Sequence, residues 1–287
     1  MPNFTEKQVK EINEASNDGE RVVSLYQNDC YYAHLSIYRF AVKMANGKKV
    51  FDAGCGTGYG SHYLKKNGAK SVFGVDFGAD AVSFCRRHFK AWGLKFRRMD
   101  LAHVTGLEEN SFDMVFTSNA LEHVPNVENF FRSAHSVLKP VGTMVVAVPP
   151  LINEKTRQAD LDNRFHLNNW SPEQWMHTMG KYFSEVTLYC HKFTRGDEIK
   201  LDFINFPDQC KITEHDFEFI EATPAKMREI GTLTAMMVAR NPRNQDELPP
   251  LGTPTDFIDE SSSREPPEGS APTEAPEERS WWKRIMR

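Results

Sequence analysis

Short apolar runs alternate with longer amphipathic segments along most of this chain. The short runs have the length of buried strands, and the longer segments carry apolar residues at the spacing of one helix face. This alternation predicts an α/β fold with a doubly wound, mostly parallel sheet that is covered by helices on both faces. We place seven strands at residues 49–53, 71–76, 94–99, 112–118, 142–148, 184–193 and 231–240.

The same pattern predicts three covering helices. Residues 79–92 and 126–138 each place apolar side chains in helical register. Ser171 followed by Pro172 predicts a helix start, because serine caps the first amides and proline suits the first helical position, so a helix should run towards Tyr182. The segment between the last two predicted strands has mixed polarity and no amphipathic pattern of helix length.

Composition divides the chain into four parts. The 287 residues, 40% of them hydrophobic, are enough for one sizeable core. We expect an N-terminal helical cap at 1–47, a ligand-binding domain at 48–240 and a disordered, acidic and proline-rich linker at 241–279, which has too few apolar side chains to fold. At 280–287, Trp281 and Trp282 beside basic residues predict a short foot that contacts a membrane surface or a partner's groove, with a frayed end as the alternative.

Net charge and cysteine content bear on the partners and the cellular compartment of the protein. The net charge of -4 and the pI near 6.2 argue against a surface for polyanions, so no nucleic-acid partner is expected. The absence of a signal-peptide pattern and of any bilayer-length apolar run predicts a cytoplasmic protein, peripheral at the inner membrane surface if the foot binds lipid. The five cysteines are an odd number without a C-x-x-C pair and are expected to be reduced thiols; they are Cys30, Cys55, Cys85, Cys190 and Cys210.

A glycine-rich loop follows the first predicted strand. The sequence of residues 50–60 is VFDAGCGTGYG, and its glycines lack a Cβ, so the main chain can approach a bound ligand closely. Asp76 ends the next predicted strand, where doubly wound folds hold an adenosine ribose. The glycine spacing does not give the G-x-G-x-x-G of dinucleotide-binding proteins, so a nicotinamide oxidoreductase is the least favoured interpretation.

The loop resembles the first motif of class I S-adenosylmethionine-dependent methyltransferases, D-x-G-x-G-x-G, through Asp52 and the three glycines that follow it. Matching segments continue in the family's order over residues 20 to 240. The resemblance implies S-adenosylmethionine as the cofactor of the domain at 48–240, and a seven-stranded sheet whose last strand is antiparallel beside the sixth. The further matches are Asp76, Asp100, FDMVFTSNALEHVPN at 112–126 and VLKPVGTMVVAVPP at 137–150.

The resemblance also implies which residues hold the cofactor. The backbone of the glycine loop would pack against the methionine part, and Asp52 would accept from its ammonium group directly or through water. Asp76 would accept from both ribose hydroxyls. Each aspartate, taken alone, has the alternative of a loop carboxylate or a helix cap. The full set of implied contacts is Gly54, Gly56, Gly58, Asp52 and Asp76, with Asp100 at the adenine amino group, the Leu101 amide in the same slot, and Asn119, Ala120 and Leu121 beside the sulfonium.

Methylation of a hydroxyl needs a group that removes its proton. We favour His166 as this base, because it follows the fifth predicted strand on the side where open α/β sheets hold their ligands; a locally bonded loop histidine is the alternative. His123 follows the fourth strand, where the resembling family commonly has a Glu-His pair, and either shapes the pocket or touches the acceptor. Glu122 and His34 are further candidates. No metal cluster is expected, although a catechol-type enzyme could assemble one from distant residues.

The N-terminal segment bears on the acceptor. Its G-E-R element at 19–21 and its H-x-x-x-Y-R-F element at 34–40 resemble a bacterial subgroup that is associated with modification of sugars, surface polysaccharides and small hydroxylated metabolites. The resemblance therefore implies O-methylation of a sugar, glycan or small hydroxylated metabolite. An N- or C-methyltransferase on a small metabolite and a non-catalytic S-adenosylmethionine-binding scaffold remain as alternatives.

Two sets of side chains are candidates to surround the acceptor. The segment TSNALEH after the fourth strand lacks the N/D-P-P-Y/F of enzymes that methylate base amines or glutamine, which disfavours those substrates. Tyr26, His34, Tyr38 and Arg39 are candidate lid residues, with a helix that only packs on the sheet as the alternative. Phe165, Trp170 and Trp175 are a candidate aromatic wall, although the helical spacing of Trp175 favours core packing.

Overall fold

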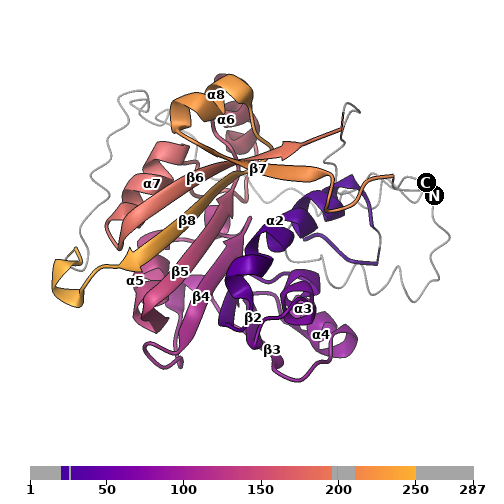
Figure 1. The fold of residues 1–287 in the computed structure, drawn as a ribbon, viewed down its shortest axis with the longest axis vertical. Helices are drawn as coiled ribbons and strands as arrows, with labels where there is room; N and C mark the ends of the chain where they lie inside the picture. The colour runs from indigo at the N-terminus through magenta and orange to yellow at the C-terminus, as the bar shows by residue number, and fades with distance from the viewer. Residues whose placement is uncertain (1–20, 26, 196–198, 200–210, 250–287) are drawn as a thin grey trace, which may run out of the picture. The chain divides into compact units, whose positions relative to one another are not determined.

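An eight-stranded sheet runs through the centre of the computed structural model, which describes residues 21–25, 27–195, 199 and 211–249. The strands lie in the order β3-β2-β1-β4-β5-β8-β6-β7 (Figure 1). Their bounds are β1 (Lys49–Ala53), β2 (Ser71–Asp76), β3 (Leu94–Arg98), β4 (Phe112–Ser118), β5 (Leu138–Val148), β6 (Phe183–Phe193), β7 (Phe217–Ala222) and β8 (Ala235–Pro242).

The direction of the strands confirms the expected α/β class and its antiparallel last strand. β1 to β5 pair in parallel, while β8 is inserted antiparallel between β5 and β6. The predicted count of seven strands is wrong, because β7 pairs antiparallel with the outer edge of β6. In β7 only Phe217 is buried, so this edge strand has neither the continuous apolar run nor the helical pattern on which the count relied.

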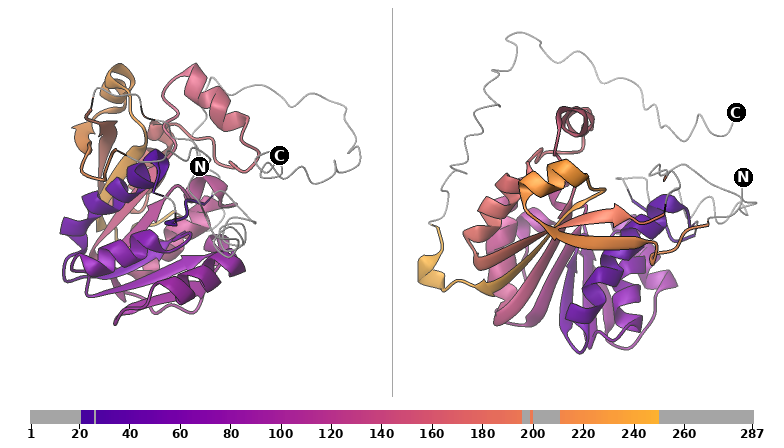
Figure 2. Two further views of the ribbon diagram at one scale, coloured as in Figure 1. Left: turned by 90° about the vertical axis from the view of Figure 1, so that its right-hand side faces the viewer. Right: turned by 45° about the horizontal axis from the view of Figure 1, so that its top comes forward.

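Successive side chains of the central strands pack alternately into two separate hydrophobic cores. Phe51, Val115 and Val146 point to one face, whereas their neighbours Val50 and Val145 point to the other, as the alternation of Cβ directions in a strand requires. α5 and α7 cover the first face, and α2, α3 and α4 cover the second (Figures 1 and 2). The sheet is therefore buried on both sides, and access to it is confined to the ends of the strands.

The helices follow the expected pattern in part. α4 ends before the exposed Trp92 and is shorter than predicted. α7 begins with a capping box, in which the Ser171 hydroxyl accepts from the Gln174 amide and the Gln174 side chain accepts in return. α3, α6 and α8 were not predicted. The bounds are α2 (Asp29–Ala45), α3 (Tyr59–Lys66), α4 (Ala79–His88), α5 (Val127–Val137), α6 (Glu154–Leu161), α7 (Pro172–Gly180) and α8 (Pro224–Ile230), with three short 3-10 turns η1 (Leu101–His103), η2 (Leu121–His123) and η3 (Gln245–Glu247).

The expected boundary at residue 240 lies too early. β8 continues to Pro242, and the Arg243 amide donates to the Tyr182 carbonyl at 2.9 Å while the carbonyl of Arg243 pairs with His135 Nε2 at 2.7 Å. Residues 241–243 thus continue the sheet domain past the expected boundary. The remainder of the expected linker and the foot with Trp281 and Trp282 lie outside the described residues, as does most of the segment before Asp29.

The cysteines and the helix lengths bear on two further expectations. The four described cysteines are buried free thiols, in agreement with the expected reduced state; they are Cys30, Cys55, Cys85 and Cys190. Among the described residues, no helix combines the length and the apolar character that crossing a membrane requires.

His191 on β6 is a buried histidine that joins α2 to the sheet. The Ser36 hydroxyl donates to the Ala33 carbonyl, so the imidazole Nε2–H donates to Ser36 Oγ at 2.8 Å. The Thr234 hydroxyl lies 3.4 Å from Nδ1, the acceptor of this tautomer. Burial, with smaller contributions from nearby His34 and Arg39, lowers the pKa of His191 to about 3. The ring is therefore neutral in the folded protein at every physiological pH.

Acidification is expected to destabilise the fold through His191. The unfolded chain takes up this proton near pH 6.5 and the folded chain only near pH 3, so the stabilisation is complete above pH 6.5 and is lost as the pH falls. Between pH 7 and 4.5 this group should lower the free energy of unfolding by about 2 to 3 kcal/mol. Urea unfolding of wild type and His191→Gln at both pH values measures it. Equal pH dependence in the two proteins would contradict the prediction.

Candidate active site

The carboxyl ends of β1, β2, β4 and β5 meet at one edge of the sheet, and the segments that follow them line a cavity of about 840 Å³. This is the position where open parallel sheets hold ligands. Three residues of the expected set, Asp52, Gly58 and Leu121, do not line the cavity. The expected cofactor residues and histidines that do line it are Gly54, Gly56, Asp76, Asp100, Leu101, Asn119, Ala120, His123 and His166.

The glycine loop has the left-handed backbone that the sequence pattern implies. Gly54, Gly56 and Gly58 have φ angles of +81°, +53° and +85°. A Cβ on Gly54 would overlap the Cβ of Ala120, and one on Gly58 would lie 2.7 Å from Cys85 Sγ. A Cβ on Gly56 would meet no atom within 4 Å, so the backbone of this glycine faces open space. The loop thus presents bare main chain to a ligand.

Asp52 lies behind the glycine loop. Its carboxylate is fully buried at the end of β1 and accepts from the Ser61 hydroxyl and, at 3.4 Å, from the Tyr38 hydroxyl. Burial raises the pKa of Asp52 to about 7, against the effect of these two hydrogen bonds. Asp52 therefore fixes the loop and α3 to the sheet, and its contact with a ligand ammonium group, directly or through water, stays a prediction.

Asp76 connects the end of β2 to the glycine loop. Its Oδ2 accepts from the Gly56 amide at 2.9 Å, and its Oδ1 accepts from the Gly78 amide at 2.9 Å and from the Arg21 guanidinium at 2.8 Å. The carboxylate lines the cavity while only 7% of the residue is exposed. Asp76 thus combines a structural role in the loop with a carboxylate edge that is directed at the cavity.

The remaining expected cofactor residues occupy two loops beside Asp76. Asp100 is exposed and caps η1 by accepting from the Ala102 amide at 2.9 Å, and Leu101 is buried beside it. Asn119 follows β4 with a φ of +47°, and its amide donates to the Ala147 carbonyl at 2.8 Å. These loops bring a carboxylate, an apolar side chain and an amide side chain to the same cavity wall.

His166 is oriented by a buried carboxylate. Its Nδ1 pairs with Oδ1 of Asp160, a residue of α6, and Oδ2 of Asp160 accepts from the Asn169 side chain at 2.7 Å. Since a carboxylate can only accept from the ring, Nδ1 carries the proton and Nε2 carries the lone pair. A chain of hydrogen bonds from Asn169 through Asp160 thus fixes the tautomer and the direction of an imidazole that lines the cavity.

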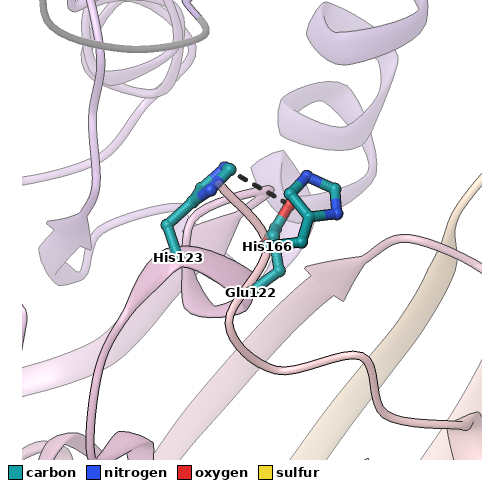
Figure 3. Close-up of side chains that lie close together, drawn as sticks. All are labelled: Glu122, His123 and His166. Carbon is teal, nitrogen blue, oxygen red and sulfur yellow. Dashed lines mark ion pairs between the residues drawn. The ribbon is translucent and has the colours of Figure 1, made fainter. Parts of the chain in front are cut away.

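His123 and Glu122 lie against His166. The rings of His123 and His166 are 4.9 Å apart in an edge-to-face arrangement, and His123 Nε2 lies 3.9 Å from Oε1 of Glu122 (Figure 3). His123 Nδ1 donates to the Phe165 carbonyl at 2.9 Å. Glu122 and His123 lie in η2 after β4, and His166 lies in the loop after α6, so the two sequence-predicted histidines belong to one cluster.

Backbone hydrogen bonds hold the loop of His166 against η2. The Glu122 carbonyl accepts from the amides of Leu167 and Asn168 at 2.7 and 3.0 Å. The side chain of Asn168 donates to the carbonyls of Leu121 and Val124 at 2.7 and 2.8 Å. The spacing of the cluster is therefore set by the main chain of two loops, and not by side-chain contacts alone.

Only some of the candidate lid residues line the cavity. His34 and Tyr38 on α2 line the cavity, in agreement with the lid interpretation. Arg39 does not, because its guanidinium donates to the carbonyls of Glu214 and Phe217 and so holds α2 to the region of β7. Tyr26 lies outside the described residues.

Only one of the three candidate wall residues lines the cavity. Phe165 lines the cavity and is 44% exposed. Trp175 is 1% exposed in the core, as its helical spacing favoured, and Trp170 packs against it at 4.7 Å between ring centroids. The acceptor side of the cavity is thus more polar than the sequence suggested.

Sequence reasoning missed two residues that hold the site together. Asp160 orients His166 from α6, a helix that was not predicted because it has few apolar positions. The sequence therefore contained no sign that the carboxylate of Asp160 pairs with the histidine six residues later. Arg21 pairs with Asp76, and its only signal was its place in the G-E-R element.

Comparison with known proteins identifies a domain in part of this chain. The family model described as "Methyltransferase domain" matches residues 51–146. "Phosphoethanolamine N-methyltransferase 3" of Arabidopsis thaliana is 33% identical over 103 residues, which are 35% of this chain and 21% of that protein. "Ubiquinone biosynthesis O-methyltransferase" of Aliivibrio fischeri is 36% identical over 98 residues, 33% of this chain and 42% of that protein. The match thus spans less than half the length of these curated relatives.

Solved structures share the fold at low sequence identity. A "SAM-dependent methyltransferase, possible histamine N-methyltransferase" from Thermotoga maritima is similar with a TM-score of 0.54 and 19% identity, over 74% of this chain and 91% of that one. A methyltransferase from Mesorhizobium loti described as S-adenosylmethionine dependent has a TM-score of 0.50 and 18% identity, over 72% and 97% of the two chains. Residues 51–146 thus form a methyltransferase domain, within a fold that this chain shares with solved S-adenosylmethionine-dependent methyltransferases.

Proposed function

We propose that this chain transfers a methyl group from S-adenosylmethionine to a hydroxyl group of a small metabolite, with sugars and glycans as the leading acceptor class. The proposal is supported by the methyltransferase domain at 51–146 and by a cavity that joins a bare glycine loop to a cluster with two histidines. The curated relatives include an O-methyltransferase and an N-methyltransferase, so the acceptor atom has to be argued from the site itself.

The cavity residues suit the parts of this cofactor. Asp76 would accept from the two ribose hydroxyls, Gly56 would lie against the methionine part through its backbone, and Asp100 with Leu101 would receive the adenine. Asn119 would lie near the sulfur. The bound cofactor supplies a methyl group on a positively charged sulfur. The chain's contribution is alignment of the acceptor and exclusion of water, from which most of the rate of such a displacement can arise.

The hydrogen bond between Asp160 and His166 is the observation that carries the choice of a hydroxyl acceptor. A hydroxyl loses its proton during methylation, whereas a neutral amine can be methylated first and lose its proton afterwards. His166 Nε2 holds the lone pair of an oriented imidazole at the cavity wall and can take that proton. Asp160 stabilises the imidazolium that results.

Two alternatives make different predictions. An N- or C-methyltransferase would tolerate loss of His166 if its acceptor needs no base. A non-catalytic scaffold would bind S-adenosylmethionine and transfer nothing.

Two measurements on the full chain test the proposal. Calorimetry should show binding of S-adenosylmethionine and of its demethylated product. Incubation with methyl-labelled S-adenosylmethionine and fractionated extracts, followed by mass spectrometry of labelled products, should show a methyl ether on a small hydroxylated compound. Absence of cofactor binding would refute the proposal as a whole, and a labelled amine as the product would favour the N-methyltransferase.

A further inference from the structure

We propose that Glu122, His123 and His166 bind a divalent transition-metal ion. Each residue offers one ligand atom, and these atoms lie within 4.8 Å of one another. The three side chains converge from two loops at the cavity wall, with the carboxylate close to both imidazoles (Figure 3). Donor atoms at this separation can converge on a single ion with bonds of about 2.0 to 2.2 Å after small rotations of the side chains.

Both imidazoles already have the orientation of metal ligands. His123 donates its Nδ1–H to the Phe165 carbonyl, and His166 donates its Nδ1–H to Asp160, so in each ring the lone pair is on Nε2. Metal-binding histidines almost always hold their second nitrogen in this way, because the outer hydrogen bond fixes the tautomer and raises the basicity of the ligand nitrogen. Two rings with this outer partner, 4.9 Å apart, are the second line of evidence for the site.

The carboxylate is the third line of evidence. The Glu122 side chain is 3% exposed, so it differs from the solvated acidic groups that are common on protein surfaces. Burial of a carboxylate costs free energy unless a nearby positive charge compensates it. A dication between Glu122 and the two imidazoles would stabilise the charged form of this carboxylate. The main-chain bonds from Leu167 and Asn168 to the Glu122 carbonyl hold the ligands at this spacing before any ion arrives.

The donor set selects the class of ion. Two imidazole nitrogens and one carboxylate oxygen suit zinc, manganese or ferrous iron, whereas magnesium prefers oxygen ligands. Three protein ligands leave coordination positions that can face the cavity. The site would therefore accept an oxygen of the acceptor, and a compound with two neighbouring hydroxyls would bind most tightly.

The catalytic part of this inference rests on the proposed function. An acceptor hydroxyl bound to the ion has a lowered pKa and releases its proton to solvent. The oxygen then forms a bond to the methyl carbon while the carbon–sulfur bond breaks, and its electron pair stays on sulfur. In this state the Nε2 lone pair of His166 is held by the ion, so His166 acts as a ligand and the ion takes over the task of proton removal.

Metal binding can be measured without any acceptor. The full chain, stripped with a chelator, is dialysed against Zn²⁺, Mn²⁺ or Mg²⁺, and bound metal is determined by elemental analysis together with the shift in Tm. We expect one Zn²⁺ or Mn²⁺ per chain and at least ~100-fold weaker binding of Mg²⁺. Glu122→Gln and His123→Ala should each abolish stoichiometric binding. Asp160→Asn, which alters only the outer partner, should weaken it about 10- to 100-fold.

The matched control is His103→Ala, which removes an exposed histidine outside the cavity and should bind metal as wild type does. Folding of every variant is checked by circular dichroism and by S-adenosylmethionine affinity, which should be unchanged by Glu122→Gln. Binding below one ion per chain for Zn²⁺ and Mn²⁺, or stoichiometric binding that survives in Glu122→Gln and His123→Ala, would overturn the site. Failure of S-adenosylmethionine to bind would refute the proposed function and leave the metal result intact.

Discussion

Asp76→Ala is expected to lower the affinity for S-adenosylmethionine about 30- to 1000-fold. The carboxylate borders the cavity and would accept from both ribose hydroxyls, so its loss removes two charge-assisted hydrogen bonds, worth about 2 to 4 kcal/mol together. The same substitution deprives the amides of Gly56 and Gly78 of their acceptor, which loosens the loop and adds to the loss. Calorimetric titration with S-adenosylmethionine and with its demethylated product measures the effect.

The matched control is Asp80→Ala, which removes an exposed carboxylate from the first turn of α4, four residues away and outside the cavity. It should bind the cofactor as wild type does. Asp76→Asn keeps one oxygen, which can accept from the Gly56 or the Gly78 amide but not from both, and it removes the charge, so its affinity should fall between those of wild type and Asp76→Ala. Wild-type affinity in Asp76→Ala would show that the ribose is held elsewhere.

Arg21 adds a condition to this prediction. Its guanidinium lies 2.8 Å from Oδ1 of Asp76, the oxygen that also accepts from Gly78. A ribose hydroxyl would have to share that oxygen with Arg21 or displace it. Arg21→Ala therefore distinguishes two roles. If Arg21 competes with the ribose for Asp76, its removal raises the affinity for S-adenosylmethionine. If Arg21 covers the bound ribose, its removal lowers that affinity.

The strands that were predicted correctly from the sequence are those that are buried along most of their length. β1, β2 and β4 lie where their apolar runs placed them, because strands covered on both faces read as continuous hydrophobic segments. β7 and α6 were missed for the opposite reason. β7 is an edge strand in which only Phe217 is buried, and α6 is largely polar with Asp160 as its buried residue. Neither carries a periodic apolar pattern.

The candidate site was predictable where its signal is local. The glycine loop and Asp76 are marked by short spacings, because the backbone conformation that a ligand needs is encoded at consecutive positions. The motif could not show that the Asp52 side chain turns behind the loop toward Ser61. The cluster of Glu122, His123 and His166 depends on hydrogen bonds between two loops that are distant in sequence, and only the three-dimensional structure brings these together.

His166→Ala is expected to lower kcat about 10²- to 10⁴-fold while leaving the affinity for S-adenosylmethionine within about twofold, because the histidine lies at the acceptor side of the cavity and takes part in proton removal. Asp160→Asn should retain part of the activity, since it keeps His166 in place but cannot stabilise a positive charge on the ring. Initial rates with the identified acceptor and calorimetry with the cofactor measure both effects. Asp162→Asn, which alters an exposed carboxylate just after α6, is the control and should turn over as wild type does. Unchanged kcat in His166→Ala would exclude this histidine both as a base and as a ligand of a catalytic ion.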